Sequence, residues 1–201
     1  HDSLRVTATT LVRVQEFEPP ADLGEQPWET ALVPSVYTPE PLDVADMRLP
    51  SPLTPVLPAS QAYVRRFLTP GRPWLEAMLD LTRHIKDEFT YDPDATQIDT
   101  PLVEVFANRA GVCQDFAHVM LSCLRSCKLP ARYVSGYLMM DDRIEQEATH
   151  AWAEAHVEGL GWVGFDVSNG ISPDPRYVRV ATGSDYRDAA PVTGISFGGM
   201  E

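Results

Sequence analysis

Cysteine, positive charge and long apolar runs are all scarce in this chain of 201 residues, and each scarcity excludes a class of protein. The chain has only 16 Lys and Arg residues but 29 Asp and Glu residues, which gives a formal net charge of -13. Without a dense cationic cluster to neutralise phosphates, we expect no nucleic-acid partner. No apolar run approaches the ~20 residues that cross a bilayer, and no signal-peptide pattern opens the chain, so we expect no membrane partner.

The three cysteines, Cys113, Cys123 and Cys127, lie close together in the sequence. An odd number at this spacing does not form a disulfide framework, and zinc would need a second Cys or His pair that the chain lacks. Free thiols are typical of a reducing compartment, so we expect a cytoplasmic protein. Helical spacing places Cys123 and Cys127 on an apolar face, where they act as small buried residues.

Prolines divide the chain into two parts, because ten of its 18 prolines lie between Pro19 and Pro58. Proline removes a backbone donor and disfavours helix at the preceding residue, so this stretch predicts an irregular connector. Its apolar side chains indicate that it lies against the folded body. Alternating apolar residues predict a strand over 4–17. We therefore expect residues 1–58 to form a strand plus the connector, and residues 59–201 to form the folded body.

Within residues 59–201, helical patterns precede strand patterns. Apolar spacing and capping residues predict four helices: 61–68 with Ser60 as N-cap, a helix from Trp74 to about Phe89, a short one after Pro101, and one that Cys113 begins. Short β-rich runs then follow, at 132–140, 150–157, 162–167 and 177–180. Glycines at positions 159 and 161 predict a tight turn that makes the second and third runs an antiparallel hairpin. The fold class is therefore α+β, with helices packed on an antiparallel sheet.

Cys113 has the local setting that a nucleophilic cysteine requires. At a helix N-terminus, the macrodipole and the unpaired N–H groups favour a thiolate and can receive an oxyanion. Gly111 would let the backbone approach a substrate closely. The next requirements are a base and a group that orients it. His150 and Asp166 fall in two adjacent predicted strands, where they can come within hydrogen-bonding reach.

Several separate blocks of the sequence together resemble the core of the transglutaminase-like superfamily. These blocks, in chain order, are Gly111-Val-Cys113-Gln-Asp115-Phe-Ala117, Leu124-Arg125, Leu129-Pro130-Ala131-Arg132-Tyr-Val134-Ser-Gly136-Tyr137, His150-Ala-Trp152-Ala-Glu154 and Gly161-Trp162-Val-Gly-Phe165-Asp166-Val-Ser168. The relatives that the chain resembles are bacterial transglutaminase-like cysteine proteases, which carry an N-terminal β-domain ahead of the core. The resemblance therefore implies that residues 1–58 are the tail of a truncated N-terminal β-domain plus the connector, and that residues 59–201 form the transglutaminase-like catalytic core. Cys127 departs from the pattern, since such sequences commonly have glycine there.

The resemblance implies a papain-like fold and assigns Cys113, His150 and Asp166 as a catalytic triad. The chemistry of such a triad needs no metal or organic cofactor. Some transglutaminases depend on calcium, but Asp141-Asp142 with Glu145 and Glu147 resembles neither an EF-hand loop nor a carboxylate cage.

Other residues of the same blocks have less defined roles. We expect Trp152 and Trp162 to wall the substrate cleft while packing the sheet. Asp115 either supplies a favourable charge at the helix N-terminus or holds Arg132. The backbone N–H of Cys113 is one oxyanion donor; the second is open between the side chains of Gln114 and Asn108. His118 is expected to point away from the apolar helix face and to have no role.

Three functions remain open on the sequence. The first is cysteine-dependent acyl transfer on a peptide or protein substrate through a thioester, with hydrolysis of a peptide or carboxamide bond favoured over transamidation of protein glutamine. The second keeps the triad but acts on another substrate, as deglycosylating and arylamine-acetylating relatives do. The third is a peptide-binding module without catalysis, for which the fold alone would suffice.

Overall fold

The computed structural model describes residues 9–15, 24–32, 40–140, 143–144 and 149–190. The expected strand over 4–17 is wrong for its described part, because residues 9–15 form no strand. Leu11 is 99% exposed, so no neighbouring strand covers its side chain. The remainder of that segment lies outside the described residues.

Helices make up the first half of the described chain. Their bounds are η1 Trp28–Leu32, α1 Leu42–Asp46, α2 Pro58–Val64, α3 Trp74–Glu88, α4 Leu102–Asn108 and α5 Cys113–Ser126. Helix α2 begins earlier than predicted, so Ser60 is not its N-cap. Instead, the Ser60 hydroxyl lies in the first turn, where it accepts the Leu57 N–H at 3.0 Å and donates to the Leu57 carbonyl at 2.8 Å. The periodic apolar positions predicted helices α3, α4 and α5 correctly.

Strands dominate the second half of the chain, as predicted. The larger sheet has the order β4-β3-β5-β6, with β7 also paired to β3, and all of its pairs are antiparallel. The strand bounds are β3 Ala131–Met140, β4 Arg143–Ile144, β5 His150–Val157, β6 Gly161–Phe165 and β7 Tyr177–Gly183. The β5–β6 hairpin is confirmed, and Gly159 and Gly161 have φ of 88° and 74°, a region that favours glycine. A short parallel pair joins β1 Thr90–Tyr91 to β2 Ala110–Gly111.

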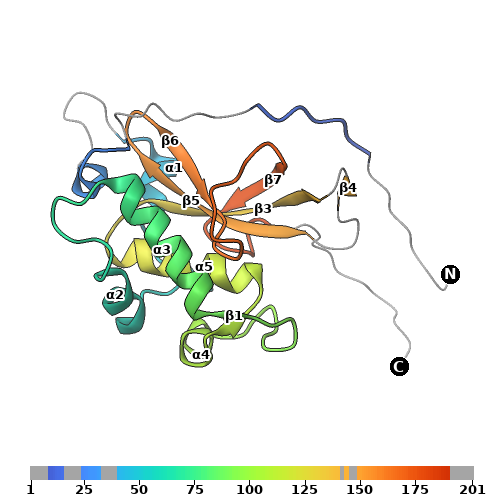
Figure 1. Cartoon of the computed structure of the whole chain (residues 1–201), viewed down its shortest axis with the longest axis horizontal. Coiled ribbons are helices and arrows are strands. Elements are labelled where there is room, and N and C mark those ends of the chain that lie inside the picture. Colours follow the sequence, from blue (N-terminus) through green and yellow to red (C-terminus); the bar gives the residue numbers. More distant parts are fainter. Residues whose placement is uncertain (1–8, 16–23, 33–39, 141–142, 145–148, 191–201) are drawn as a thin grey trace.

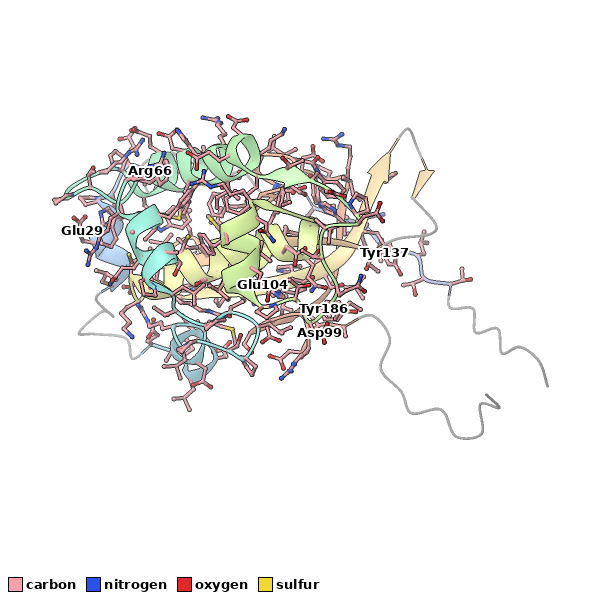
Figure 2. All side chains as sticks on the ribbon, turned by 90° about the horizontal axis from the view of Figure 1, so that it is seen from below. Glu29, Arg66, Asp99, Glu104, Tyr137 and Tyr186 are labelled. Atoms are coloured by element: carbon pink, nitrogen blue, oxygen red, sulfur yellow. The ribbon has the colours of Figure 1, made fainter. Side chains whose placement is uncertain are left out.

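The two faces of the sheet have different environments. Ala151, Ala153 and Ala155 of β5 belong to the main core, which α3 and α5 complete (Figure 1). Because side chains alternate along a strand, His150 and Trp152 lie on the other face. There Trp152 packs with Val134 and Tyr177 in a second, smaller cluster. Strand β3 continues beyond the helical layer toward β4, with Tyr137 near this end (Figure 2).

Arg125 joins the connector to the core from inside the molecule. Its side chain is 0% exposed and donates to the carbonyls of Met47 at 3.1 Å, Ala131 at 2.7 Å and Ser184 at 2.8 Å, and to the hydroxyl of Thr54. Burial lowers the pKa of Arg125 to about 10, so the guanidinium keeps its charge at neutral pH. The described part of the connector therefore lies against the folded body, as its apolar residues predict.

Candidate active site

Cys113 is the first residue of α5 and is partly exposed. Its helix begins after Val112, the N-cap residue, which has an extended backbone and directly follows strand β2. In the part of the chain that the structure describes, no acceptor is bound to the backbone N–H groups of Cys113 and Gln114. Helix geometry leaves these first N–H groups without partners inside the helix. The sulfur therefore lies beside donors that can stabilise negative charge.

Asp115 fixes this helix start to the loop before α4. Its Oδ2 atom accepts the Val112 N–H at 2.9 Å and the Thr96 hydroxyl at 2.6 Å. Burial raises the pKa of Asp115, and these two hydrogen bonds oppose that effect. A Cβ atom at Gly111 would lie 2.5 Å from Asp115 Oδ2, so glycine leaves room for the carboxylate. Glycine is needed at position 111 because a side chain there would collide with Asp115. The sequence alone instead indicated a close approach of a substrate to the backbone at this glycine.

His150 and Asp166 come together because their strands pair. β5 and β6 are antiparallel with Ala153 opposite Phe165, so Asp166 follows the end of β6 close to the start of β5. His150 Nε2 lies 2.7 Å from Asp166 Oδ2. The Asp166 side chain is 0% exposed and that of His150 is 16% exposed. This arrangement matches the sequence-based pairing of the two residues.

Asp166 is surrounded by donors that the sequence did not reveal. Its Oδ2 also accepts the Tyr177 hydroxyl at 2.6 Å and the Asn169 side-chain amide at 2.7 Å. Its Oδ1 accepts the Ser168 hydroxyl at 2.8 Å and the backbone N–H groups of Ser168 at 3.0 Å and Asn169 at 3.1 Å. Both carboxylate oxygens are therefore held in place. Ser168 and Asn169 follow Asp166 directly, so an Asx-turn signal could have found them; Tyr177 gave no such signal.

The electrostatics of the site favour a protonated His150. Burial lowers the pKa of His150, but hydrogen bonds and charge from Asp166 and Cys113 outweigh burial and raise it to about 9. Burial raises the pKa of Asp166, yet His150 first, then Tyr177 and Asn169, lower it to about 2. Since Nε2 of His150 faces Asp166, Nδ1 is the ring nitrogen left for Cys113. The imidazole thus links a thiol to a carboxylate.

The two tryptophans expected to wall a cleft have different positions. Trp152 lies beside His150, with ring centroids 6.2 Å apart, but it is only 2% exposed and supports the imidazole from within the sheet. Trp162 pairs with His156, six residues along β5 from His150, which corresponds to roughly 20 Å. There the Arg132 guanidinium lies 4.2 Å from the Trp162 ring centroid. Trp162 therefore belongs to the opposite end of the strand, because the hairpin register fixes its place.

Three further expectations about polar residues are corrected. The Gln114 side chain donates to the Ile98 carbonyl at 3.1 Å, so it is turned away from an oxyanion position. Arg132 pairs with Glu154, at 2.6 Å, and not with Asp115. His118 is buried, 4% exposed, and its Nε2 accepts the Tyr186 N–H at 3.2 Å, so it has a structural role. Asn108, the other candidate donor, is an exposed residue at the end of α4.

The other thiols differ from Cys113 in their surroundings. Cys123 is fully buried, and burial raises its pKa well above the ordinary range. Burial also raises the pKa of Cys127. Among the described residues, no group of three or more His, Cys, Asp or Glu side chains could hold a metal ion. The acidic loop with Asp141 and Asp142 lies outside the described residues, and no described helix is long and apolar enough to cross a membrane.

Comparison with known proteins identifies the family and the fold of this chain. A family model described as the transglutaminase-like superfamily matches residues 61–167. An uncharacterized protein of Mycobacterium tuberculosis is 37% identical over 220 aligned residues, covering 100% of this chain and 67% of that protein. The crystal structure of a "Putative Cysteine Protease from Cytophaga hutchinsonii" superposes with a TM-score of 0.66 and 28% identity, over 78% of this chain and 52% of that one.

One relative has a named activity. The protein-glutamine gamma-glutamyltransferase of Pseudomonas aeruginosa is 27% identical over 139 residues, which cover 62% of this chain but only 20% of that protein. This chain also spans about half of the Cytophaga structure. These likenesses establish an α+β fold of the transglutaminase-like and papain-like type for this chain.

Proposed function

This chain belongs to the transglutaminase-like superfamily, and on that premise we propose that it catalyses cysteine-dependent acyl transfer on peptide or carboxamide bonds. Cys113 is the nucleophile, His150 the general acid and base, and Asp166 the residue that orients His150. The observation that carries the proposal is the position of His150, whose Nε2 lies 2.7 Å from the buried Asp166 carboxylate and whose pKa is raised by Asp166 and by Cys113 at the start of α5. A thiol, an imidazole and a buried carboxylate in this order have the geometry that an activated cysteine needs.

In the proposed reaction, the Cys113 thiolate attacks the carbonyl carbon of the substrate. The negative charge that develops on the carbonyl oxygen is stabilised by the backbone N–H of Cys113 at the start of α5. His150 then gives its proton to the leaving nitrogen as the C–N bond breaks, and a thioester remains on the sulfur. Water or an amine attacks the thioester, His150 takes a proton from this second nucleophile, and the thiolate is regenerated.

Hydrolysis is the favoured outcome, and transamidation is the second candidate. The likeness to a protein-glutamine gamma-glutamyltransferase supports the second, because both reactions share the same thioester and differ only in the acceptor. Peptides or proteins are the substrate class in either case. A substrate-binding role for Trp162 has no support from its position at the far end of β5.

Turnover on glutamine-containing and other peptides, with and without hydroxylamine, tests the proposal. We expect a covalent acyl-enzyme on Cys113 by intact-mass spectrometry after acid quench, ammonia or amine release, and loss of both with Cys113→Ala. Hydroxamate formation that exceeds hydrolysis would select transamidation. Full turnover by Cys113→Ala would overturn the mechanism, and tight peptide binding without an acyl-enzyme would identify a binding module.

A further inference from the structure

Tyr177 contacts both Asp166 and His150, but it is neither the proposed nucleophile nor the proposed base. It begins β7, is 5% exposed, and stands opposite Leu138 on β3. Its ring contacts two residues of β5: the centroid of His150 is 5.9 Å away and that of Trp152 is 5.5 Å away. β7 therefore brings one buried aromatic side chain against the imidazole.

The hydroxyl of Tyr177 has a specific acceptor. It donates to Asp166 Oδ2 at 2.6 Å, and the same oxygen lies 2.7 Å from His150 Nε2. Burial, followed by the hydrogen bond and charge of Asp166, raises the pKa of Tyr177, so the phenol stays protonated and remains a donor. One carboxylate oxygen thus accepts hydrogen bonds from both His150 and Tyr177.

We propose that Tyr177 is a positioning residue of this site, which holds Asp166 through its hydroxyl and the His150 ring through its own ring. The inference rests on the proposed function, because it concerns how the base of that reaction is oriented. Tyr177 supplies one of the three donors on Asp166 Oδ2, which helps to keep the carboxylate from rotating away from the imidazole, and its ring, packed on the imidazole, limits the rotation of His150. In this role Tyr177 acts through Asp166 and His150.

The proposed role of Tyr177 has a measurable consequence for the pKa of His150. The titratable groups that face His150 are Asp166 after β6, Cys113 on α5 and Tyr177 on β7, and Asp174 adds its charge near Tyr177. A donor on Asp166 Oδ2 draws charge from the carboxylate and leaves less for the imidazolium. Removing the Tyr177 hydroxyl should therefore stabilise the protonated imidazole.

NMR titration of ¹⁵N-labelled histidine tests this directly, without any substrate. In Tyr177→Phe the His150 pKa, about 9 in the native protein, should rise by roughly half a unit to one unit, which corresponds to one neutral hydrogen bond. Tyr63→Phe removes a hydroxyl from another buried tyrosine, on α2, and should leave the His150 pKa unchanged. A folded Tyr177→Phe whose His150 titrates as in the native protein would overturn the inference.

A second measurement covers the case in which Tyr177→Phe does not fold. Incorporating fluorotyrosine keeps every ring in place and makes the phenol a stronger donor, so the His150 pKa should fall. An unchanged or raised value would contradict the role of Tyr177. Because neither titration needs turnover, a shifted His150 with no acyl-enzyme would reject the proposed function alone, and turnover with an unmoved His150 would reject the positioning role alone.

Discussion

At the residue scale, the pKa of His150 depends on the charge of Asp166. The carboxylate is 0% exposed and accepts six hydrogen-bond donors from the described part of the chain, so its removal would leave six donors without this acceptor. A neutral side chain there would leave the imidazole buried without its charge partner. An asparagine would also place its NH₂ group among donors in either orientation of the amide, because three of the six donors point at each oxygen.

We predict that Asp166→Asn lowers the His150 pKa below its native value of about 9, since only Cys113 then opposes the effect of burial. Activity should fall by roughly a thousandfold or more, as expected when the orienting carboxylate of a triad is neutralised. NMR titration and initial rates measure the two effects. The matched control is Asp87→Asn on the exposed face of α3, which should change neither. Retention of the native His150 pKa in Asp166→Asn would refute this account of the site.

At the element scale, the start of α5 depends on the fit between Gly111 and Asp115. The Asp115 carboxylate returns to the N–H of Val112 and at the same time accepts Thr96, so the helix start and the preceding loop share one anchor. The position of Cys113 follows from this anchor. A methyl group at Gly111 would meet Asp115 Oδ2 at 2.5 Å and its Cβ at 2.8 Å.

Gly111→Ala should therefore destabilise the protein by about 1–3 kcal/mol, the usual cost of overpacking, and slow alkylation of Cys113 as its helix start shifts. Urea denaturation and alkylation rates measure these effects. In an Asp115→Ala background the contacts with Oδ2 and Cγ disappear while the contact with Cβ at 2.8 Å remains, so the same substitution should cost less. Equal costs in both backgrounds would mean that Asp115 is not what excludes a side chain at position 111.

Local patterns predicted the elements that bear the candidate triad, and non-local pairing decided the rest. Apolar periodicity beginning at Cys113 predicted the helix start, and glycines at the turn predicted the β5–β6 hairpin, which explains the proximity of His150 and Asp166. Tyr177 was missed because its contact with Asp166 depends on how β7 pairs with β3. The expectation for Trp162 failed for the same reason, since only the register of the hairpin shows how far it lies from His150.

At the scale of the whole molecule, stability should depend on pH through histidines held in opposite protonation states. Burial lowers the pKa of His118 to about 4, and the charges that face it are Asp185 and Arg125. The unfolded chain binds a proton at position 118 below about pH 6.5 while the folded protein does not, so stability falls as pH drops through this range. His150 has the opposite effect: its contribution is complete below pH 6.5 and is lost as pH rises through about 9.

We predict that the free energy of unfolding decreases between pH 7 and pH 5, and that His118→Gln removes a large part of this decrease. His156 contributes in the same direction, because burial lowers its pKa too, so some dependence should remain. Asp166 does not contribute in this window, since its stabilisation is lost only as pH falls from about 4 toward 2. Urea titrations at both pH values measure the effect, with exposed His84→Gln as the control. An identical pH dependence in His118→Gln and the native protein would contradict this explanation.

The central claim, that Cys113 and His150 form an activated pair, is tested most directly by alkylation of the thiols across pH. Iodoacetamide should modify Cys113 selectively, because burial raises the pKa of Cys123 and Cys127. If His150 activates the sulfur as proposed, this reaction should proceed well below the pH at which an ordinary thiol reacts. Mass spectrometry locates the modified residue. The account predicts that this reactivity at low pH is lost in His150→Ala. Slow, unselective alkylation that does not respond to His150→Ala would contradict it.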